Sequence, residues 1–158
     1  MPVSIMITGG FTMRINTRCS VAIHILTLVA LNGEEPATSE MMAASVGSHP
    51  VVIRQAMSLL KKAGLIETQN GLPGGRLTKP QEEITLYDVY KAVQSPDGNA
   101  LFDVHKNPNP ECPVGRNIAA ALNEPIMHAQ RAMENALKDY TLKDITAYII
   151  EKYTLQTK

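Results

Sequence analysis

The 158-residue chain has no tryptophan, few aromatic residues and only two cysteines, and each shortage narrows the class of protein. Cys19 and Cys112 are too few for a disulfide framework and lack the spacing of a zinc site, so we expect a reducing, cytoplasmic location. The longest apolar run, residues 21–31, is shorter than the ~20 residues that span a bilayer, so we expect no membrane segment. Eight methionines and many alanines favour a helical fold.

Sequence motifs for catalysis are also missing. The four histidines are scattered, and we find no metal-ligand spacing, no glycine-rich phosphate loop and no nucleophile motif. Glu124 and His128 lie at helical spacing, which is more typical of a surface pair than of a metal site. We therefore expect neither an enzyme nor a metal protein.

Charge is segregated along the chain although the net charge is zero. Residues 1–80 hold seven Lys or Arg against four Asp or Glu, a balance of +3, whereas residues 81–158 hold eight against eleven, a balance of −3. Between residues 47 and 80 five basic side chains are opposed only by Glu67. Such local positive charge is typical of segments that bind phosphate groups.

Capping residues and apolar spacing predict three helices in the first half of the chain. The first covers residues 17–31, and the second is capped by Thr38 or Ser39 and stopped by Gly47. The third covers residues 50–63. Two short helices joined by a tight turn match the helix-turn-helix pattern.

A β-hairpin is predicted directly after this helix pair. The runs LIETQ (65–69) and RLTKP (76–80) flank NGLPGG, whose glycines and proline indicate a turn. A hairpin in this position is the wing of a winged helix. The predicted fold class is therefore mainly α with a small β-hairpin wing, a winged helix-turn-helix joined to a long dimerisation helix.

The predicted third helix has two different faces. The core side should hold Val52, Ile53, Ala56, Met57, Leu59, Leu60 and Ala63, and the outer side Val51, Arg54, Gln55 and Ser58, with Lys61 and Lys62 near its end. An ordinary solvated face would mix Glu with Lys, but no acid occurs between residues 41 and 64. This pattern favours a recognition helix that enters the major groove of DNA.

In the second half of the chain, the sequence predicts a helix from Ile84 with Thr85 as its cap, a long helix over residues 114–140 and a last helix after Thr141. Pro125 should kink the long helix or divide it after Asn123. Apolar residues recur along it at alternating three and four spacing: Ala119, Leu122, Ile126, Ala129, Met133, Ala136 and Tyr140. This seam could pack within its own chain, but a dimer is favoured because few other elements are left to cover it.

These features divide the chain into three parts. Residues 1–12 are expected to form a flexible N-terminal extension, with an ordered arm packed on the body as the alternative. Residues 13–80 form the predicted winged-helix DNA-binding domain, and residues 81–158 a helical dimerisation region.

Four segments resemble the Rrf2 family of bacterial transcription regulators. They are MRINTRCSVAIHILTL, HPVVIRQAMSLLKKAGLIET, ITLYDVYKAV and NPNPECPVGRNI, and the resemblance covers nearly the whole chain from Met13. It implies a homodimer, a winged helix-turn-helix that binds DNA and a crossing dimerisation helix.

The chain departs from the family members that carry three closely spaced cysteines for an iron–sulfur cluster. Between residues 100 and 118 it has only Cys112, with His105 nearby, and one thiolate cannot supply the usual ligand set. The wing also lacks the family's glycine-glycine-aromatic ending. We expect no cofactor and a place in the cluster-free subgroup. Cys112 is either a redox-sensing thiol, activated by the start of the long helix, or an inert loop residue.

The sequence thus predicts a homodimeric regulator, with repression favoured, that binds double-stranded DNA at a palindromic operator. Candidate base contacts are Ser48, His49, Arg54, Gln55 and Ser58. Candidate phosphate contacts are Arg14, Thr38, Ser39, Lys61, Lys62, Gly74, Gly75, Arg76 and Lys79. The alternative is a winged helix that binds another protein without specific DNA binding.

Overall fold

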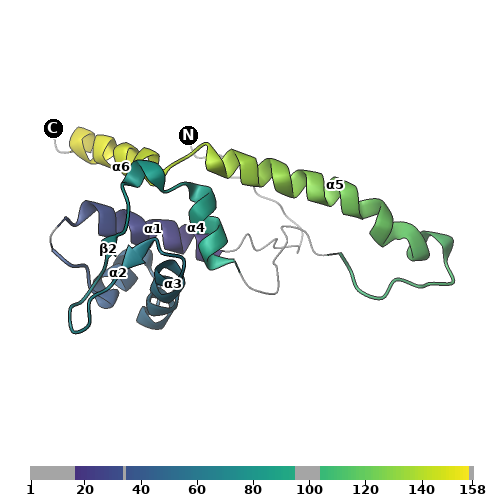
Figure 1. Cartoon of the computed structure of the whole chain (residues 1–158), viewed down its shortest axis with the longest axis horizontal. Coiled ribbons are helices and arrows are strands. Elements are labelled where there is room, and N and C mark those ends of the chain that lie inside the picture. Colours follow the sequence, from purple (N-terminus) through teal and green to yellow (C-terminus); the bar gives the residue numbers. More distant parts are fainter. Residues whose placement is uncertain (1–16, 34, 95–103, 157–158) are drawn as a thin grey trace.

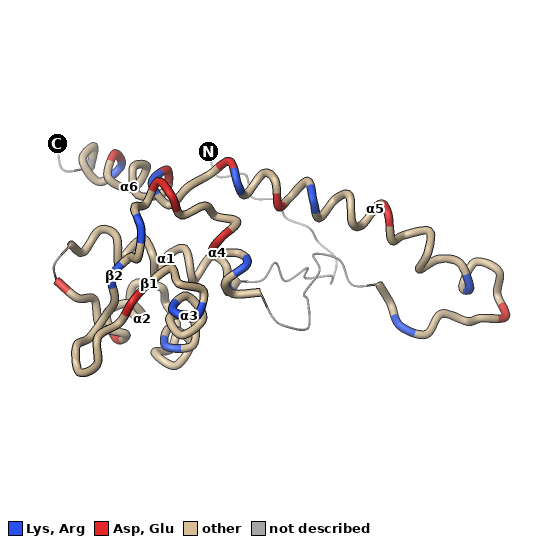
Figure 2. Tube along the Cα trace, in the orientation of Figure 1, with Lys and Arg blue, Asp and Glu red and all other residues tan. Residues whose placement is uncertain are grey.

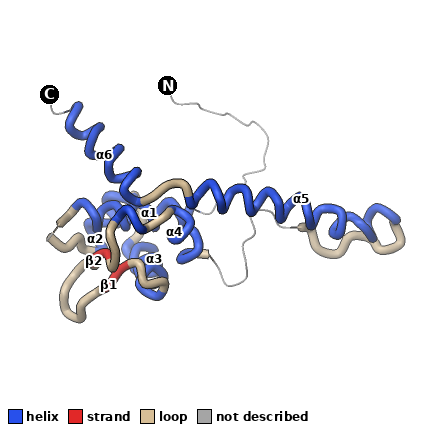
Figure 3. Tube along the Cα trace, turned by 45° about the horizontal axis from the view of Figure 1, so that its top comes forward, coloured by secondary structure: helices blue, strands red, loops and turns tan. Residues whose placement is uncertain are grey.

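The computed structural model describes residues 17–33, 35–94 and 104–156, and it shows a head of short helices from which one long helix projects (Figure 1). The predicted N-terminal extension and Arg14 lie outside the described residues, as do residues 95–103. Figure 3 shows the same arrangement from a second side, with the small sheet at the edge of the head.

The head is built around α1 (Thr17–Leu31), α2 (Ser39–Val46) and α3 (Pro50–Lys62). Large apolar side chains from all three helices meet in one core, in which Ile25, Leu26, Met42, Ile53 and Leu60 are fully buried. Burial of a side chain of this size stabilises the fold by roughly 1.5–3 kcal/mol. The predicted helix-turn-helix is confirmed.

Local capping explains where α2 begins and ends. The side chain of Thr38 accepts a hydrogen bond from the Met41 N–H at 3.2 Å, which satisfies one of the free amides of the first turn. Gly47 adopts a left-handed conformation with φ of 70° and turns the chain toward α3. Thr38 is therefore the cap rather than Ser39.

The core side of α3 is narrower than the sequence predicts. Ile53, Ala56 and Leu60 are buried, but Val52 is 41% exposed and Ala63 is also exposed. Neighbouring elements contact only the middle of the apolar face of α3, and residues at its edges stay exposed to solvent. The prediction that Val52 and Ala63 face the core was therefore wrong.

The wing consists of β1 (Ile66–Glu67) and β2 (Arg76–Leu77), paired antiparallel with Ile66 opposite Leu77. Gly74 lies at the base of the connecting loop with φ of 80°. A Cβ atom at this position would lie 2.9 Å from the carbonyl oxygen of Ala37, in the segment before α2. Glycine therefore permits the close contact between the wing and that segment.

A short 3₁₀ helix, η1 (Gln81–Glu83), follows the wing and leads into α4 (Leu86–Val93). Thr85 and Asp88 form the two reciprocal hydrogen bonds of a capping box at the start of α4, which confirms Thr85 as the cap. Val89 and Val93 are buried, and α4 packs against α1 and α3. It also contacts the long helix α5 (Pro113–Lys138) and so lies between the first three helices and the predicted dimerisation region.

The long helix α5 (Pro113–Lys138) has no buried residue, and the structure describes all of it. It passes through Pro125 as a single helix, so of the two predicted outcomes, a kink or a division after Asn123, the division does not occur. Proline removes one backbone hydrogen bond, and on a solvated helix water can replace it.

The last helix, α6 (Leu142–Gln156), starts where the chain returns to the head. Tyr140 lies beyond the end of α5, and its carbonyl accepts a hydrogen bond from the Leu86 N–H at 2.9 Å. The Leu142 N–H in turn donates to the Ile84 carbonyl at 2.8 Å. This backbone pairing removes Tyr140 from the helical seam that the sequence predicts and joins α6 to the base of α4.

Candidate DNA-binding surface

The outer face of α3 is exposed and carries only positive charge. Val51, Arg54, Gln55, Ser58, Lys61 and Lys62 are all exposed. Figure 2 shows basic but no acidic residues on α3, whereas α4, α5 and α6 carry residues of both signs. A face of this composition attracts the phosphate backbone of DNA.

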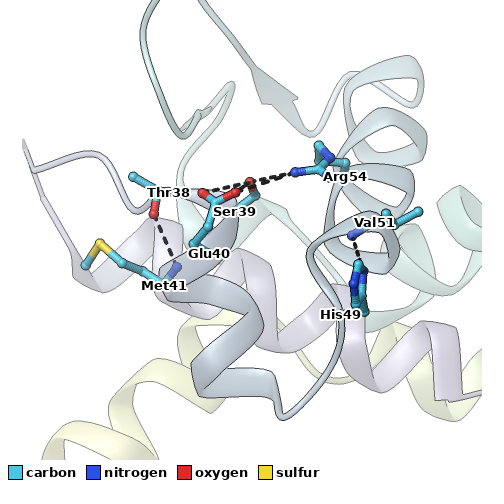
Figure 4. A network of polar contacts seen from close by, with 7 residues as sticks. All are labelled: Thr38, Ser39, Glu40, Met41, His49, Val51 and Arg54. Carbon is cyan, nitrogen blue, oxygen red and sulfur yellow. Dashed lines mark hydrogen bonds and ion pairs between the residues drawn. The ribbon is translucent and has the colours of Figure 1, made fainter.

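The start of α3 is capped by a histidine. The Nδ1 atom of His49 accepts a hydrogen bond from the Val51 N–H at 3.3 Å, as Figure 4 shows. A neutral ring that accepts through Nδ1 carries its proton on Nε2, so the outer edge of His49 is a donor. Its neighbour Ser48 is half-buried, and its backbone N–H donates to the Ala43 carbonyl at 3.0 Å.

Arg54 lies in a small polar network with the first turn of α2 (Figure 4). Its Nη1 atom is 3.4 Å from the Ser39 hydroxyl oxygen and 3.5 Å from Oε1 of Glu40. The Ser39 hydroxyl lies 3.2 Å from both oxygens of the Glu40 carboxylate. Glu40 was not predicted from the sequence, because this residue stands just before the acid-free window and belongs to a different helix.

The end of α3 is connected to the wing. The Nζ atom of Lys61 donates a hydrogen bond to the Thr68 hydroxyl at 2.7 Å. An open groove, called here the wing groove, lies between α2, α3 and the wing. It brings together six residues that the sequence predicts for DNA contact: Thr38, Ser39, Arg54, Ser58, Lys61 and Gly74.

Other predicted contacts lie elsewhere on the head. Gly75 and Arg76 line a second hollow beside the wing loop, together with Gly33. Lys79 forms an ion pair with Asp88 at 3.8 Å. The same carboxylate accepts the Thr85 N–H in the capping box of α4. A phosphate that binds Lys79 would have to replace this partner. Gln55 borders a hollow toward α1.

Apolar side chains lie along α5 and also along α6. Leu122, Ile126, Ala129 and Met133 are half-buried, whereas Ala119, Ala136 and Tyr140 are exposed. On α6 the exposed apolar side chains are Tyr148, Ile149, Ile150, Tyr153 and Leu155. Soluble monomers rarely expose large apolar patches, so α5 and α6 are each candidates for contact with another chain.

The two cysteines lie in opposite environments. Burial raises the pKa of the Cys19 thiol, which packs against the core from α1. Cys112 is exposed at the start of α5, where the backbone N–H groups of Gly115 and Val114 lower the pKa of its thiol. Cys112 is therefore the more reactive of the two.

The described residues contain neither a cluster of metal ligands nor a membrane span. Over 17–33, 35–94 and 104–156, no group of three or more His, Cys, Asp and Glu side chains could hold a metal ion. None of the helices in that part of the chain has the length and hydropathy that crossing a membrane requires.

A helix-turn-helix followed directly by a two-stranded wing defines the molecule as a winged helix-turn-helix protein. The model of the Rrf2 family, described as an iron-dependent transcriptional regulator, matches residues 15–148. The chain therefore belongs to the Rrf2 family of transcriptional regulators, as its sequence motifs predict.

One relative and two solved structures are similar to this chain, the second structure in fold alone. "Putative HTH-type transcriptional regulator YwnA" of Bacillus subtilis is 47% identical over 135 residues, which cover 85% of this chain and 98% of YwnA. A solved structure described as "a putative DNA binding protein" is 43% identical, with a TM-score of 0.66 over 81% of this chain and 97% of that chain. CymR, the global cysteine regulator of Bacillus subtilis, shares the fold at 23% identity, with a TM-score of 0.61 over 85% of this chain and 97% of CymR.

Proposed function

We propose that the protein is a homodimeric transcriptional repressor that binds a palindromic DNA operator in the cytoplasm and catalyses no reaction. The wing groove carries this proposal, because it gathers candidate DNA contacts from α2, α3 and the wing into one surface. A recognition helix of this kind enters the major groove while the wing contacts the flanking backbone.

The side chains of α3 divide into two roles in this proposal. Arg54 can pair with guanine and Gln55 with adenine, and Ser48, His49 and Ser58 lie beside them. Lys61, Lys62 and Arg76 contact phosphates, aided by Thr38, Ser39, Gly74 and Gly75. Lys79 joins them only if it leaves Asp88. Arg14 keeps its proposed phosphate role, although it lies outside the described residues.

The dimer is proposed from the uncovered surface of α5 and α6. The apolar seam of α5 lies on a helix without a buried residue, so a second copy of the chain is the partner that would cover it. Because α4 packs on the core, the proposed DNA-binding head contains residues 13–80 together with α4. We assign dimerisation to α5 and α6.

Iron binding does not fit the residues of this chain, although the family description mentions iron. Iron–sulfur clusters are held chiefly by several cysteine thiolates. The sequence contains two cysteines, of which Cys19 is packed against the core. We propose that the protein functions without a cluster.

A thiol-based signal input at Cys112 is part of the proposal. The thiol is exposed and its pKa is lowered, which favours the reactive thiolate, and it lies at the start of the proposed dimer helix. Peroxide should therefore weaken operator binding by the native protein and leave Cys112→Ser unaffected. If the serine variant loses binding equally, Cys112 is an inert loop residue.

The primary test is selection of bound sites from a random pool of duplex DNA, combined with light scattering to measure the mass in solution. We expect the selected DNA to be enriched in a palindromic sequence and the protein to have the mass of a dimer. A dimer that enriches no sequence and binds DNA only at low salt would contradict the proposal and favour a winged helix that binds another protein.

A further inference from the structure

The structure places one carboxylate beside the positive face of the recognition helix. Residues 41–64 contain no acid, yet α2 brings Glu40 to 3.5 Å from Arg54. Both side chains are largely exposed, Arg54 to 56% and Glu40 to 69%. An exposed pair of this kind adds little to stability. Its position on the DNA-binding face points to a different role.

The geometry leaves part of the guanidinium available for DNA. A guanidinium carries several N–H donors in a rigid planar fork, and only Nη1 of Arg54 is within reach of Ser39 and Glu40. Two of the remaining donors suffice for a bidentate contact with guanine. A side chain that is already held in place loses less conformational entropy when it binds.

The same pair reduces attraction to phosphates. With Glu40 beside it, Arg54 presents little net charge to the DNA backbone, and the carboxylate itself repels phosphates. Most sites in random DNA lack a guanine at the required position, so Arg54 makes no bidentate base contact at them. At the operator, the guanine contact compensates for the approach of the carboxylate to DNA.

We propose that Glu40 is a positioning residue that directs Arg54 to a single base pair and lowers binding to random DNA. Ser39 takes part by bridging the carboxylate and the guanidinium. This inference rests on the proposed function, in which Arg54 reads a base. It adds a source of discrimination on α2, outside the recognition helix.

The test compares Glu40→Gln with native protein on the selected operator and on random duplex DNA. Loss of the carboxylate frees Arg54 for phosphates, so affinity for random DNA should rise and the ratio of specific to random affinity should fall about fivefold. The salt dependence of random binding should steepen by about 0.9 per subunit, the slope for one added phosphate contact. Thermal melting of both proteins shows that the fold is retained.

Glu67→Gln is the matched control. It removes the same charge from an exposed acid on β1 of the wing, and no ion pair between Glu67 and Arg54 occurs among the described contacts. A general effect of charge should change both affinities by the same factor and leave the ratio unchanged. If Glu40→Gln behaves in the same way as Glu67→Gln, Glu40 acts only through net charge and the inference is overturned.

The double variant separates this inference from the function on which it rests. In an Arg54→Ala background, Glu40→Gln should no longer change the ratio, because the positioned group is gone. If Arg54→Ala relaxes specificity but the Glu40 effect persists without Arg54, only the positioning role fails. If Arg54→Ala leaves specificity intact, Arg54 reads no base, and both the base assignment and the positioning role fail.

Discussion

Replacement of Gly74 by alanine tests whether contact with the segment before α2 holds the wing in place. The backbone at Gly74 has φ of 80°, and the added Cβ would lie 2.9 Å from the Ala37 carbonyl oxygen and 3.0 Å from Cβ of Pro36. A left-handed conformation costs a non-glycine residue about 1 kcal/mol, and overpacking costs about 1–3 kcal/mol more. We therefore expect Gly74→Ala to lower the free energy of unfolding by about 2–4 kcal/mol.

Gly71→Ala provides a matched control in the same loop. Gly71 has the same φ of 80°, but nothing lies within 4 Å of the position that its added Cβ would take. Only the conformational cost applies, so we expect a loss of about 1 kcal/mol. Urea denaturation followed by circular dichroism measures both free energies.

Operator affinity provides the second readout for these variants. A wing that moves to relieve the Gly74→Ala clash is displaced from the wing groove, so binding should weaken about tenfold relative to Gly71→Ala, equivalent to ~1.4 kcal/mol. If the two variants have equal free energies of unfolding and equal operator affinities, the contact with Ala37 does not position the wing and the reasoning is refuted.

Three further predictions concern single side chains. Arg54→Ala should relax specificity at one base pair per half-site by ~1–3 kcal/mol, whereas Lys62→Ala should weaken all sequences and lower the salt slope by about 0.9, as binding titrations at several salt concentrations would show. Hydrogen bonds with Thr141 at the start of α6 lower the pKa of Asp144 below its ordinary 3.8. The ionised carboxylate therefore stabilises the folded protein above pH 3.8, and this stabilisation is lost as the pH falls through the lowered pKa of the folded state. Circular dichroism should show an acid-induced loss of helix that Asp144→Asn lacks. Iodoacetamide should modify Cys112 before Cys19 in peptide mass maps, and equal rates would contradict their opposite pKa shifts.

Prediction from the sequence worked where the controlling interactions are local. The caps formed by Thr38, Thr85 and Thr141 bond to amides three residues away, so their residue types and spacing are visible in the chain. Gly47 and the wing loop are equally local signals. The order of helices, turn and wing, and with it the fold class, therefore follows from short-range chemistry.

Prediction failed where neighbours from other elements decide the outcome. Tyr140 continues the apolar spacing of α5, but backbone pairing with Leu86 places it outside the helix. Val52 belongs to the apolar arc of α3, yet no neighbouring element covers it fully. Helical periodicity shows which side of a helix is apolar, but it does not show how wide the contact with its neighbours is.

The sequence by itself determined that this protein is a winged helix-turn-helix of the Rrf2 family with a basic outer face on its third helix. Only the tertiary structure decided which partners its charged groups have. The crossing of α2 and α3 brings Ser39 and Arg54 together although they are fifteen positions apart, and Lys79 meets Asp88 across the start of α4. Ion pairs depend on distances of a few ångströms between elements, and these distances are set by how the core packs.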